Sequence, residues 1–448
     1  MLTVPKTLKH FDLPSLVDQE IVSYGRIYRI GKRSKFWFLK IRTADCSNDT
    51  TLIVNKNILP KPTTYSTVAF KGLVQRSPDG KVCEIMASEI IFYGPFEPQD
   101  VQVEFGMAPH LLRQKESQRL LTRQYQAIMW LYQKTEDALH SVSRDLGLLR
   151  IRAPFITFSD CEGGGEVFEV HSKIKGFFKK PAFLTVSGQV DEETVTSRFL
   201  CPTYIFGPSF RSDPSQTQFH ACEFYHYEPE IPFITLDGLM DLEENTLKKT
   251  IGKLLADEES REFLGHLERD LDSLQQFVDR SFARVTYTEA VKILQTCNKQ
   301  FERAVEWGTD LCKEHERYLC DEFFGSPTFV YQYPSSFKSF YMLQCDVIET
   351  DTQTGQHKLQ VCESVDLLVP GIGELCGGSL REHRYDVLVE MMKKKGLKLE
   401  DYEDYLRLRR EGTFPHGGYG LGFDRLVMFI TGAQSIRDIC PFPRYYNG

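Results

Sequence analysis

Two segments of this chain, about two hundred residues apart, combine cations and glycines in a way that suits a phosphorylated ligand. The first is the run 206–211, Phe-Gly-Pro-Ser-Phe-Arg, which is followed by His220 and Phe224. The second is the glycine-rich run 417–422, which leads into an apolar helix carrying Arg425. Glycines let a flat ligand approach the backbone closely, and a fixed guanidinium can neutralise phosphate. Together the segments indicate a nucleotide site, although no stretch fits the phosphate-loop pattern G-x-x-x-x-G-K-[ST].

A pair of acids offers a place for a divalent cation. Asp366 and Glu374 flank a turn that contains Pro370 and Gly371. Such a pair can hold Mg²⁺, which prefers carboxylate and phosphate oxygens in octahedral geometry. Two ordinary acids on either side of a hairpin would give the same pattern, so the residues alone leave both interpretations open.

The two nucleotide segments resemble motifs 2 and 3 of the class II aminoacyl-tRNA synthetases. Within that class, the run V-P-G-I-G-E followed by G-G-S-x-R-E at 369–382, and the ending P-F-P-R at 441–444, are more similar to the asparaginyl enzymes than to the aspartyl or lysyl ones. The resemblance covers roughly residues 20–444. It implies an asparagine–tRNA ligase that uses ATP and Mg²⁺, with L-asparagine, ATP and tRNA(Asn) as its partners.

The resemblance also implies roles for single residues of the nucleotide site. Arg211 would contact the ATP α-phosphate and the attacking carboxylate, and Arg425 would clamp the phosphate tail. His220 would reach the γ-phosphate, Phe224 would stack on adenine, and Asp213 would contact adenine and the tRNA end. The implied ATP-binding residues are Arg211, Asp213, His220, Phe224, Glu374, Gly422 and Arg425; Arg211 and Arg425 are also the implied catalytic residues, and Asp366 and Glu374 the implied metal ligands.

The amino-acid pocket is expected in two further segments of the resemblance. Glu162 and Gln189 would bind the α-ammonium of the substrate, and Glu193 and Arg381 would bind its side chain. An amide offers two N–H donors and one carbonyl acceptor, so a carboxylate and a guanidinium together satisfy it. Aspartate in the same pocket would set one carboxylate against another, which disfavours the nearest competitor. Three adjacent acids at 191–193 leave the choice of Glu193 open by one residue.

Three positions near Arg211 depart from the family's motif. Phe219 stands where relatives usually have an arginine, Asp213 replaces the usual glutamate, and Pro214 stiffens the intervening loop. We therefore expect weaker ATP binding or altered coupling to tRNA. Three alternatives stay open: a non-discriminating aspartyl-tRNA synthetase, a paralogue that makes free asparagine, and a non-catalytic RNA-binding protein on a synthetase scaffold.

Residues 20–93 are expected to form a separate β domain. Five short runs rich in β-branched and aromatic residues suit a small barrel such as an OB-fold. The segment between Glu20 and Asp45 carries seven Lys or Arg and no acid, and period-two alternation sends Phe36 and Phe38 to one face. Such a face can stack unpaired bases, although the aromatics could equally fill the barrel. With the resemblance, this surface is expected to read the anticodon through Arg29, Lys35, Phe36 and Phe38.

The remaining elements place the motifs in an α+β protein. We expect an OB-fold domain at 1–94, a hinge at 95–116, and a class II catalytic domain with an antiparallel sheet at 117–448. A helix from about 117 to 145 and a strand at 148–158 containing Pro154 resemble motif 1, which implies a homodimer. Helices are expected over about 237–320.

Bulk properties restrict the class of protein. The chain of 448 residues has a net charge of −8 and no apolar run of eighteen residues, so no membrane span is expected. Its beginning lacks the pattern of a signal peptide or presequence, and its twelve cysteines show no C-x-x-C pair. These features predict a cytoplasmic protein with reduced thiols.

Overall fold

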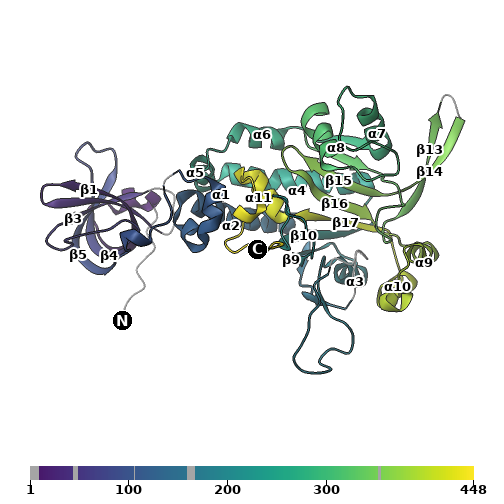
Figure 1. Ribbon diagram of the computed structural model, residues 1–448, viewed down its shortest axis with the longest axis horizontal. Helices are drawn as coiled ribbons and strands as arrows, with labels where there is room; N and C mark the ends of the chain where they lie inside the picture. The colour runs from purple at the N-terminus through teal and green to yellow at the C-terminus, as the bar shows by residue number, and fades with distance from the viewer. Residues whose placement is uncertain (1–9, 44–48, 105, 159–166, 352–354, 448) are drawn as a thin grey trace. The chain divides into compact units, whose positions relative to one another are not determined.

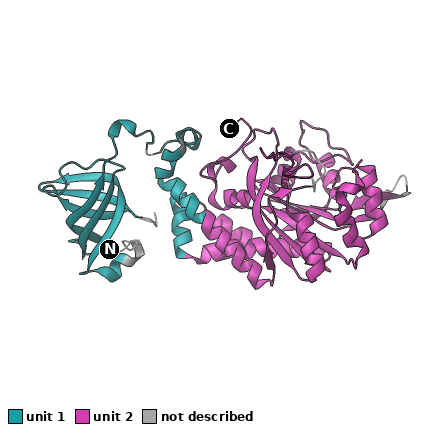
Figure 2. Ribbon diagram, turned by 90° about the horizontal axis from the view of Figure 1, so that it is seen from below, with its two compact units in different colours: residues 1–131, 258–269 teal, residues 132–257, 270–448 magenta. Residues whose placement is uncertain are grey.

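The computed structural model describes residues 10–43, 49–104, 106–158, 167–351 and 355–447. The chain forms two compact units: residues 1–131 with 258–269, and residues 132–257 with 270–448 (Figure 2). A short helical segment from the second half of the chain therefore belongs to the N-terminal unit. In the described parts of the chain, no helix combines the length and apolar character that crossing a membrane requires.

The N-terminal unit contains a closed five-stranded barrel with the strand order β1-β2-β3-β5-β4 (Figure 1). Its strands are β1 Glu20–Arg33, β2 Phe36–Arg42, β3 Thr50–Asn55, β4 Thr67–Arg76 and β5 Cys83–Gly94. The interior is filled by alternate apolar residues of all five strands, among them Ile27, Leu39, Leu52, Phe70 and Ile85, each fully buried. The predicted OB-type barrel is confirmed, because period-two alternation leaves one face of each strand to a common core.

The second unit is built on an eight-stranded sheet with the order β11-β12-β15-β16-β17-β10-β9-β6 (Figure 1). The strands of this unit are β6 Leu149–Ile151, β7 Ile156–Thr157, β8 Phe183–Leu184, β9 Thr203–Phe210, β10 Glu223–Pro232, β11 Ala283–Thr286, β12 Thr328–Tyr331, β13 Gln344–Asp351, β14 Gly355–Cys362, β15 Ser364–Val369, β16 Gly373–Leu380 and β17 His416–Gly422. The middle of the sheet is antiparallel as predicted, but the edge pairs β6–β9 and β11–β12 are parallel. The fold class is α+β.

The helices of the described chain are divided between the two units, and those at 109–112 and 258–266 belong to the first. The helices are α1 Pro109–Leu112, α2 Arg123–Asp145, α3 Gln189–Phe199, α4 Leu236–Ala256, α5 Glu258–His266, α6 Leu271–Asp279, α7 Tyr287–Thr296, α8 Lys313–Arg317, α9 Tyr385–Lys394, α10 Glu403–Arg410 and α11 Phe423–Thr431. Helix α4 packs against β15, β16 and β17, and α11 packs against β10 and β17.

Three predicted elements differ in detail from the structure. The helix expected from 117 begins as an α-helix only at Arg123, and a 3₁₀ segment precedes it over 113–121. The strand expected at 148–158 is split into β6 and β7 around Pro154, which has no N–H to donate to a ladder. The segment 237–320 is not entirely helical, because β11 lies within it and pairs with β12.

Candidate active site

A cleft of about 420 Å³ lies in the second unit, lined by residues of strands β10, β15, β16 and β17. Residues from widely separated parts of the chain line it, including Gln189, Arg211, Phe224, Glu374 and Arg425. The cleft therefore unites both segments that the sequence analysis identified as a nucleotide site. It also contains the expected acids and part of the expected amino-acid pocket.

The glycines of β17 form part of the floor of the cleft. Gly418, Gly420 and Gly422 alternate along one face of the strand. A Cβ added at Gly420 would have only one heavy atom within 4 Å, the carbonyl oxygen of Gly377 at 3.9 Å. Gly420 thus leaves bare backbone open to the cleft, where a planar ligand can lie.

Two arginines bring positive charge to this floor. Arg211 follows β9, where its N–H donates to the Cys222 carbonyl at 3.0 Å, and its guanidinium carbon lies 5.5 Å from the centre of the Phe224 ring. Arg425 is in the first turn of α11, and its Nη1 donates to the Glu374 carbonyl at 2.8 Å. Burial, followed by these two arginines, lowers the pKa of His226 well below its usual range. The imidazole stays neutral, so the positive charge is carried by guanidinium groups that keep it at any physiological pH.

His220 and Asp213 occupy the loop between β9 and β10. The His220 ring nitrogen Nδ1 lies 3.2 Å from Ser215 Oγ, and its Nε2 lies 3.7 Å from Asp213 Oδ2. Burial lowers the pKa of His220, and the positive charge of Lys313 adds to this effect. Both predicted residues line the cleft together with Arg425.

Asp366 and Glu374 converge on the strand beside the glycine floor. A Cβ added at Gly377 would lie 3.2 Å from Glu374 Oε1 and 3.4 Å from Asp366 Oδ1, so the two carboxylates share the space that this glycine leaves. Burial and the neighbouring Asp366 raise the pKa of Glu374. A cation would relieve the repulsion between these two carboxylates. Their hard oxygen donors fit Mg²⁺. The sequence analysis did not identify Lys338, whose ammonium donates a hydrogen bond to Asp366 Oδ2 at 2.6 Å.

The structure places a different carboxylate from the predicted Glu193 in contact with Arg381. Glu230 of β10 accepts from Arg381 Nη2 at 2.8 Å and from its Nε at 3.1 Å, and both side chains are almost fully buried. Glu193 Oε1 lies 4.0 Å from Arg381 Nε. The Glu230–Arg381 pair lines the cleft, so it is the carboxylate–guanidinium combination that a ligand meets.

Glu193 is fully buried behind the cleft wall. It accepts from Arg409 Nη2 at 2.7 Å, from the Tyr405 hydroxyl at 3.0 Å and from Gln189 Nε2 at 2.9 Å. Burial alone would raise the pKa of Glu193, but Arg409 and the nearby His416 hold it well below its usual range. The hydrogen bond to Glu193 fixes the Gln189 amide, whose carbonyl oxygen then remains as an acceptor.

One signal in the sequence could have found Glu230. Phe224, His226, Glu228 and Glu230 alternate along β10 and line the cleft together. Period-two alternation from Phe224 predicts this shared face. The remaining member of the predicted amino-acid pocket, Glu162, lies outside the described residues.

The predicted anticodon residues lie on the barrel of the N-terminal unit. Arg29 pairs across the β1–β2 ladder with Lys40, and Phe38 pairs with Gly31. Phe36 follows on the same face of β2, and Lys35 lies in the turn between the strands. Trp37 points the other way, and its Nε1 donates to the Leu59 carbonyl at 2.8 Å. The alternation therefore puts Trp37 against the core and leaves Phe36 and Phe38 on the basic outer face.

Comparisons with known proteins give the chain its relatives. The model of the family "tRNA synthetases class II (D, K and N)" matches residues 109–446. The asparagine–tRNA ligase of Microcystis aeruginosa is 36% identical over 95% of each chain, and that of Klebsiella pneumoniae is 38% identical over 96% of this chain and 95% of its own. The solved structure of asparaginyl-tRNA synthetase from Pyrococcus horikoshii complexed with asparaginyl-adenylate is similar with a TM-score of 0.85 and 29% identity, covering 100% of this chain and 99% of that one.

Proposed function

Because this chain belongs to the class II tRNA synthetases of the D, K and N group, we propose that it is an asparagine–tRNA ligase. It activates L-asparagine with ATP and transfers it to tRNA(Asn). The observation that carries the choice of amino acid is the buried Glu230–Arg381 pair facing the cleft. Relatives at 36–38% identity that are named asparagine–tRNA ligases support the same choice.

The first step joins asparagine to the nucleotide. A carboxylate oxygen of asparagine attacks the α-phosphorus of ATP, a new P–O bond forms, and pyrophosphate leaves. Arg211 stabilises the charge that develops on the α-phosphate, because a fixed guanidinium in a cleft needs no reorganisation during the reaction. Phe224 stacks on adenine, Gly420 and Gly422 let the nucleotide lie against β17, and Arg425 holds the phosphate tail.

The other predicted nucleotide residues assist this step. His220 contacts the γ-phosphate, and Asp213 contacts adenine and the tRNA end. Asp366 and Glu374 would hold Mg²⁺, which supplies charge neutralisation to the phosphate oxygens when bound. Lys338 keeps Asp366 oriented and partly neutralised.

Recognition of the side-chain amide falls to Glu230 and Arg381. Glu230 accepts from the amide NH₂ group, and Arg381 donates to the amide oxygen. Aspartate would bring a carboxylate against Glu230, and this repulsion disfavours it. Gln189, fixed by Glu193, and Glu162 bind the α-ammonium.

The second step transfers the asparaginyl group to tRNA. The terminal adenosine hydroxyl attacks the acyl carbon, and AMP leaves. Arg29, Lys35, Phe36 and Phe38 of the barrel bind the anticodon through charge and stacking. A homodimer and a cytoplasmic location stay predictions; light scattering after size-exclusion chromatography tests the dimer.

Pyrophosphate exchange into ATP tests the proposal directly. Purified protein with Mg²⁺ is given asparagine, aspartate or no amino acid. We expect exchange with asparagine alone, and we expect Glu230→Gln to reduce the preference for asparagine over aspartate. Exchange driven by aspartate alone would instead favour an aspartyl enzyme or an asparagine-making paralogue. No exchange from folded protein would leave a non-catalytic RNA-binding relative.

A further inference from the structure

Two cations of helix α8 lie against the ring of Phe219, a residue that lines the cleft. The Lys313 ammonium is 5.2 Å from the centre of this ring, and the Arg317 guanidinium carbon is 5.9 Å from it. Phe219 is 7% exposed and lines the cleft, whereas Lys313 and Arg317 are exposed. The ring thus holds positive charge beside the cleft, since an aromatic face attracts a cation within about 6 Å.

The carboxylates of Glu316 and Asp213 are near enough to favour the charged form of Lys313, but burial and the positive charge of Arg425 outweigh them. Within the described residues, no carboxylate forms an ion pair with its ammonium, although α8 also contains Glu314 and Glu316. Burial, followed by the positive charge of Arg425, lowers the pKa of Lys313. Neighbouring positive charges repel one another, and a bound anion relieves this repulsion. This group of cations therefore suits a ligand with several negative charges.

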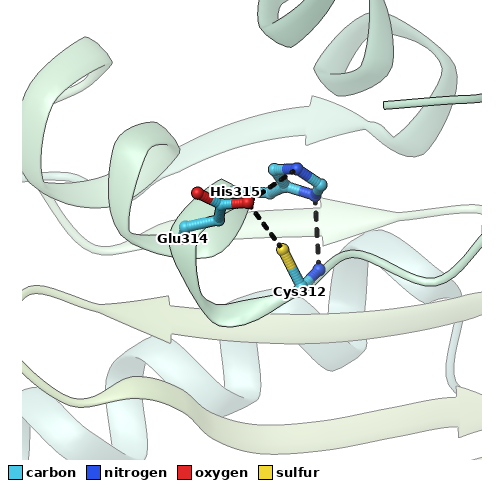
Figure 3. Close-up of side chains that lie close together, drawn as sticks. All are labelled: Cys312, Glu314 and His315. Atoms are coloured by element: carbon cyan, nitrogen blue, oxygen red, sulfur yellow. Dashed lines mark hydrogen bonds and ion pairs between the residues drawn. The ribbon is translucent and has the colours of Figure 1, made fainter. Parts of the chain in front are cut away.

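Cys312, Glu314 and His315 contact one another at the start of α8 (Figure 3). The Cys312 N–H donates to His315 Nδ1 at 3.3 Å, and His315 Nε2 donates to the Arg303 carbonyl at 3.0 Å. Glu314 accepts from the Arg303 N–H at 2.8 Å. Both ring nitrogens of His315 are engaged with backbone groups, so this cluster fits a clamp for α8 better than a metal site.

We propose that Lys313 binds the outer phosphates of ATP and the pyrophosphate formed from them, with the Phe219 ring as its support. The inference rests on the proposed function for the identity of the nucleotide. The positive charge that the resembling motif carries at position 219 would then be supplied from α8. This arrangement offsets the weaker ATP binding that Phe219 leads one to expect.

Calorimetric binding of three ligands to a set of charge variants tests the inference. The ligands are ATP with Mg²⁺, pyrophosphate with Mg²⁺, and AMP. Lys313→Met should weaken the first two about tenfold, the loss expected for one charge-assisted contact at a partly solvated site, and leave AMP affinity unchanged. Lys313→Arg should retain affinity. Lys299→Met is the matched control, because Lys299 lies 5.4 Å from the Tyr318 ring and pairs with Glu322.

Two results would overturn the inference: wild-type ATP affinity in Lys313→Met, or equal losses for ATP and AMP. Since Lys313 is exposed, its replacement is not expected to lower the thermal midpoint, which is recorded for each variant. Failure of the proposed function is distinguishable. Wild-type protein without asparagine-dependent exchange, but with the selective ATP loss in Lys313→Met, would refute the ligase and keep the phosphate contact.

Discussion

Gly418 and Gly420 lie on the same face of β17, but a methyl group meets different surroundings at the two positions. At Gly418 it would overlap Glu230 Oε2 and the Pro229 carbonyl oxygen, and it would lie 2.9 Å from Arg381 Nη2. At Gly420 the nearest heavy atom is 3.9 Å away. Neither glycine has a positive φ, so alanine fits the backbone conformation at both positions. The two substitutions therefore separate the packing behind the cleft from the bare backbone that faces it.

The magnitudes follow from these contacts. Gly418→Ala must displace the Pro229 backbone or separate the buried Glu230–Arg381 pair; overpacking costs about 1–3 kcal/mol and breaking a buried ion pair about 3–5 kcal/mol. We expect the free energy of unfolding of the second unit to fall by about 3–5 kcal/mol. Gly420→Ala should instead raise it by about 0.5–1 kcal/mol, because alanine loses less conformational entropy on folding.

Two assays on each variant check this expectation. Calorimetric unfolding should show the transition of the second unit lowered by roughly 5–10 °C in Gly418→Ala and not lowered in Gly420→Ala. ATP affinity should fall about tenfold in Gly420→Ala, because its methyl group enters the space proposed for the nucleotide. A wild-type unfolding midpoint for Gly418→Ala would refute the packing argument, and unchanged ATP affinity in Gly420→Ala would refute the placement of the nucleotide on β17.

Three further substitutions test the buried Asp424 of the second unit and two aromatic residues of the barrel. Burial raises the pKa of Asp424 to about 6 from the ordinary 3.8, so the folded protein holds more protons in that interval and its stability falls as pH rises through it. Asp424→Asn should remove up to about 3 kcal/mol of this loss. The unfolding midpoint should therefore rise at neutral pH but not in acid below the ordinary pKa. An equal rise at the two pH values would contradict the raised pKa of Asp424. In the barrel, Phe38→Ala should weaken tRNA binding roughly tenfold or more without changing asparagine-dependent pyrophosphate exchange. Trp37→Ala should unfold the barrel, which circular dichroism measures as a loss of β signal. Unchanged tRNA affinity in Phe38→Ala would argue against stacking on this face.

Much of the local structure could be predicted because it depends on neighbours in the chain. Strand β4 follows period-two alternation closely, and the outward direction of Phe38 with the inward direction of Trp37 needs no long-range information. The glycine-rich strand and the apolar helix behind it were predictable for the same reason. The break at Pro154 was also visible, since proline cannot donate to a ladder, although the prediction ran one strand through it.

The sequence by itself determined the motifs and their spacing, because each motif is a short stretch of chain: the first runs from β9 through a loop into β10, and the second runs from β17 into α11. Only the tertiary structure decided which acid meets Arg381. Glu193 belongs to the segment predicted for the amino-acid pocket, but it lies on α3 and pairs with Arg409. Strand pairing instead brings Glu230 to Arg381, which is 151 residues away in the chain. The placement of Lys313 against Phe219 is likewise a tertiary contact. Such contacts depend on how separate elements pack, and neither composition nor periodicity records that.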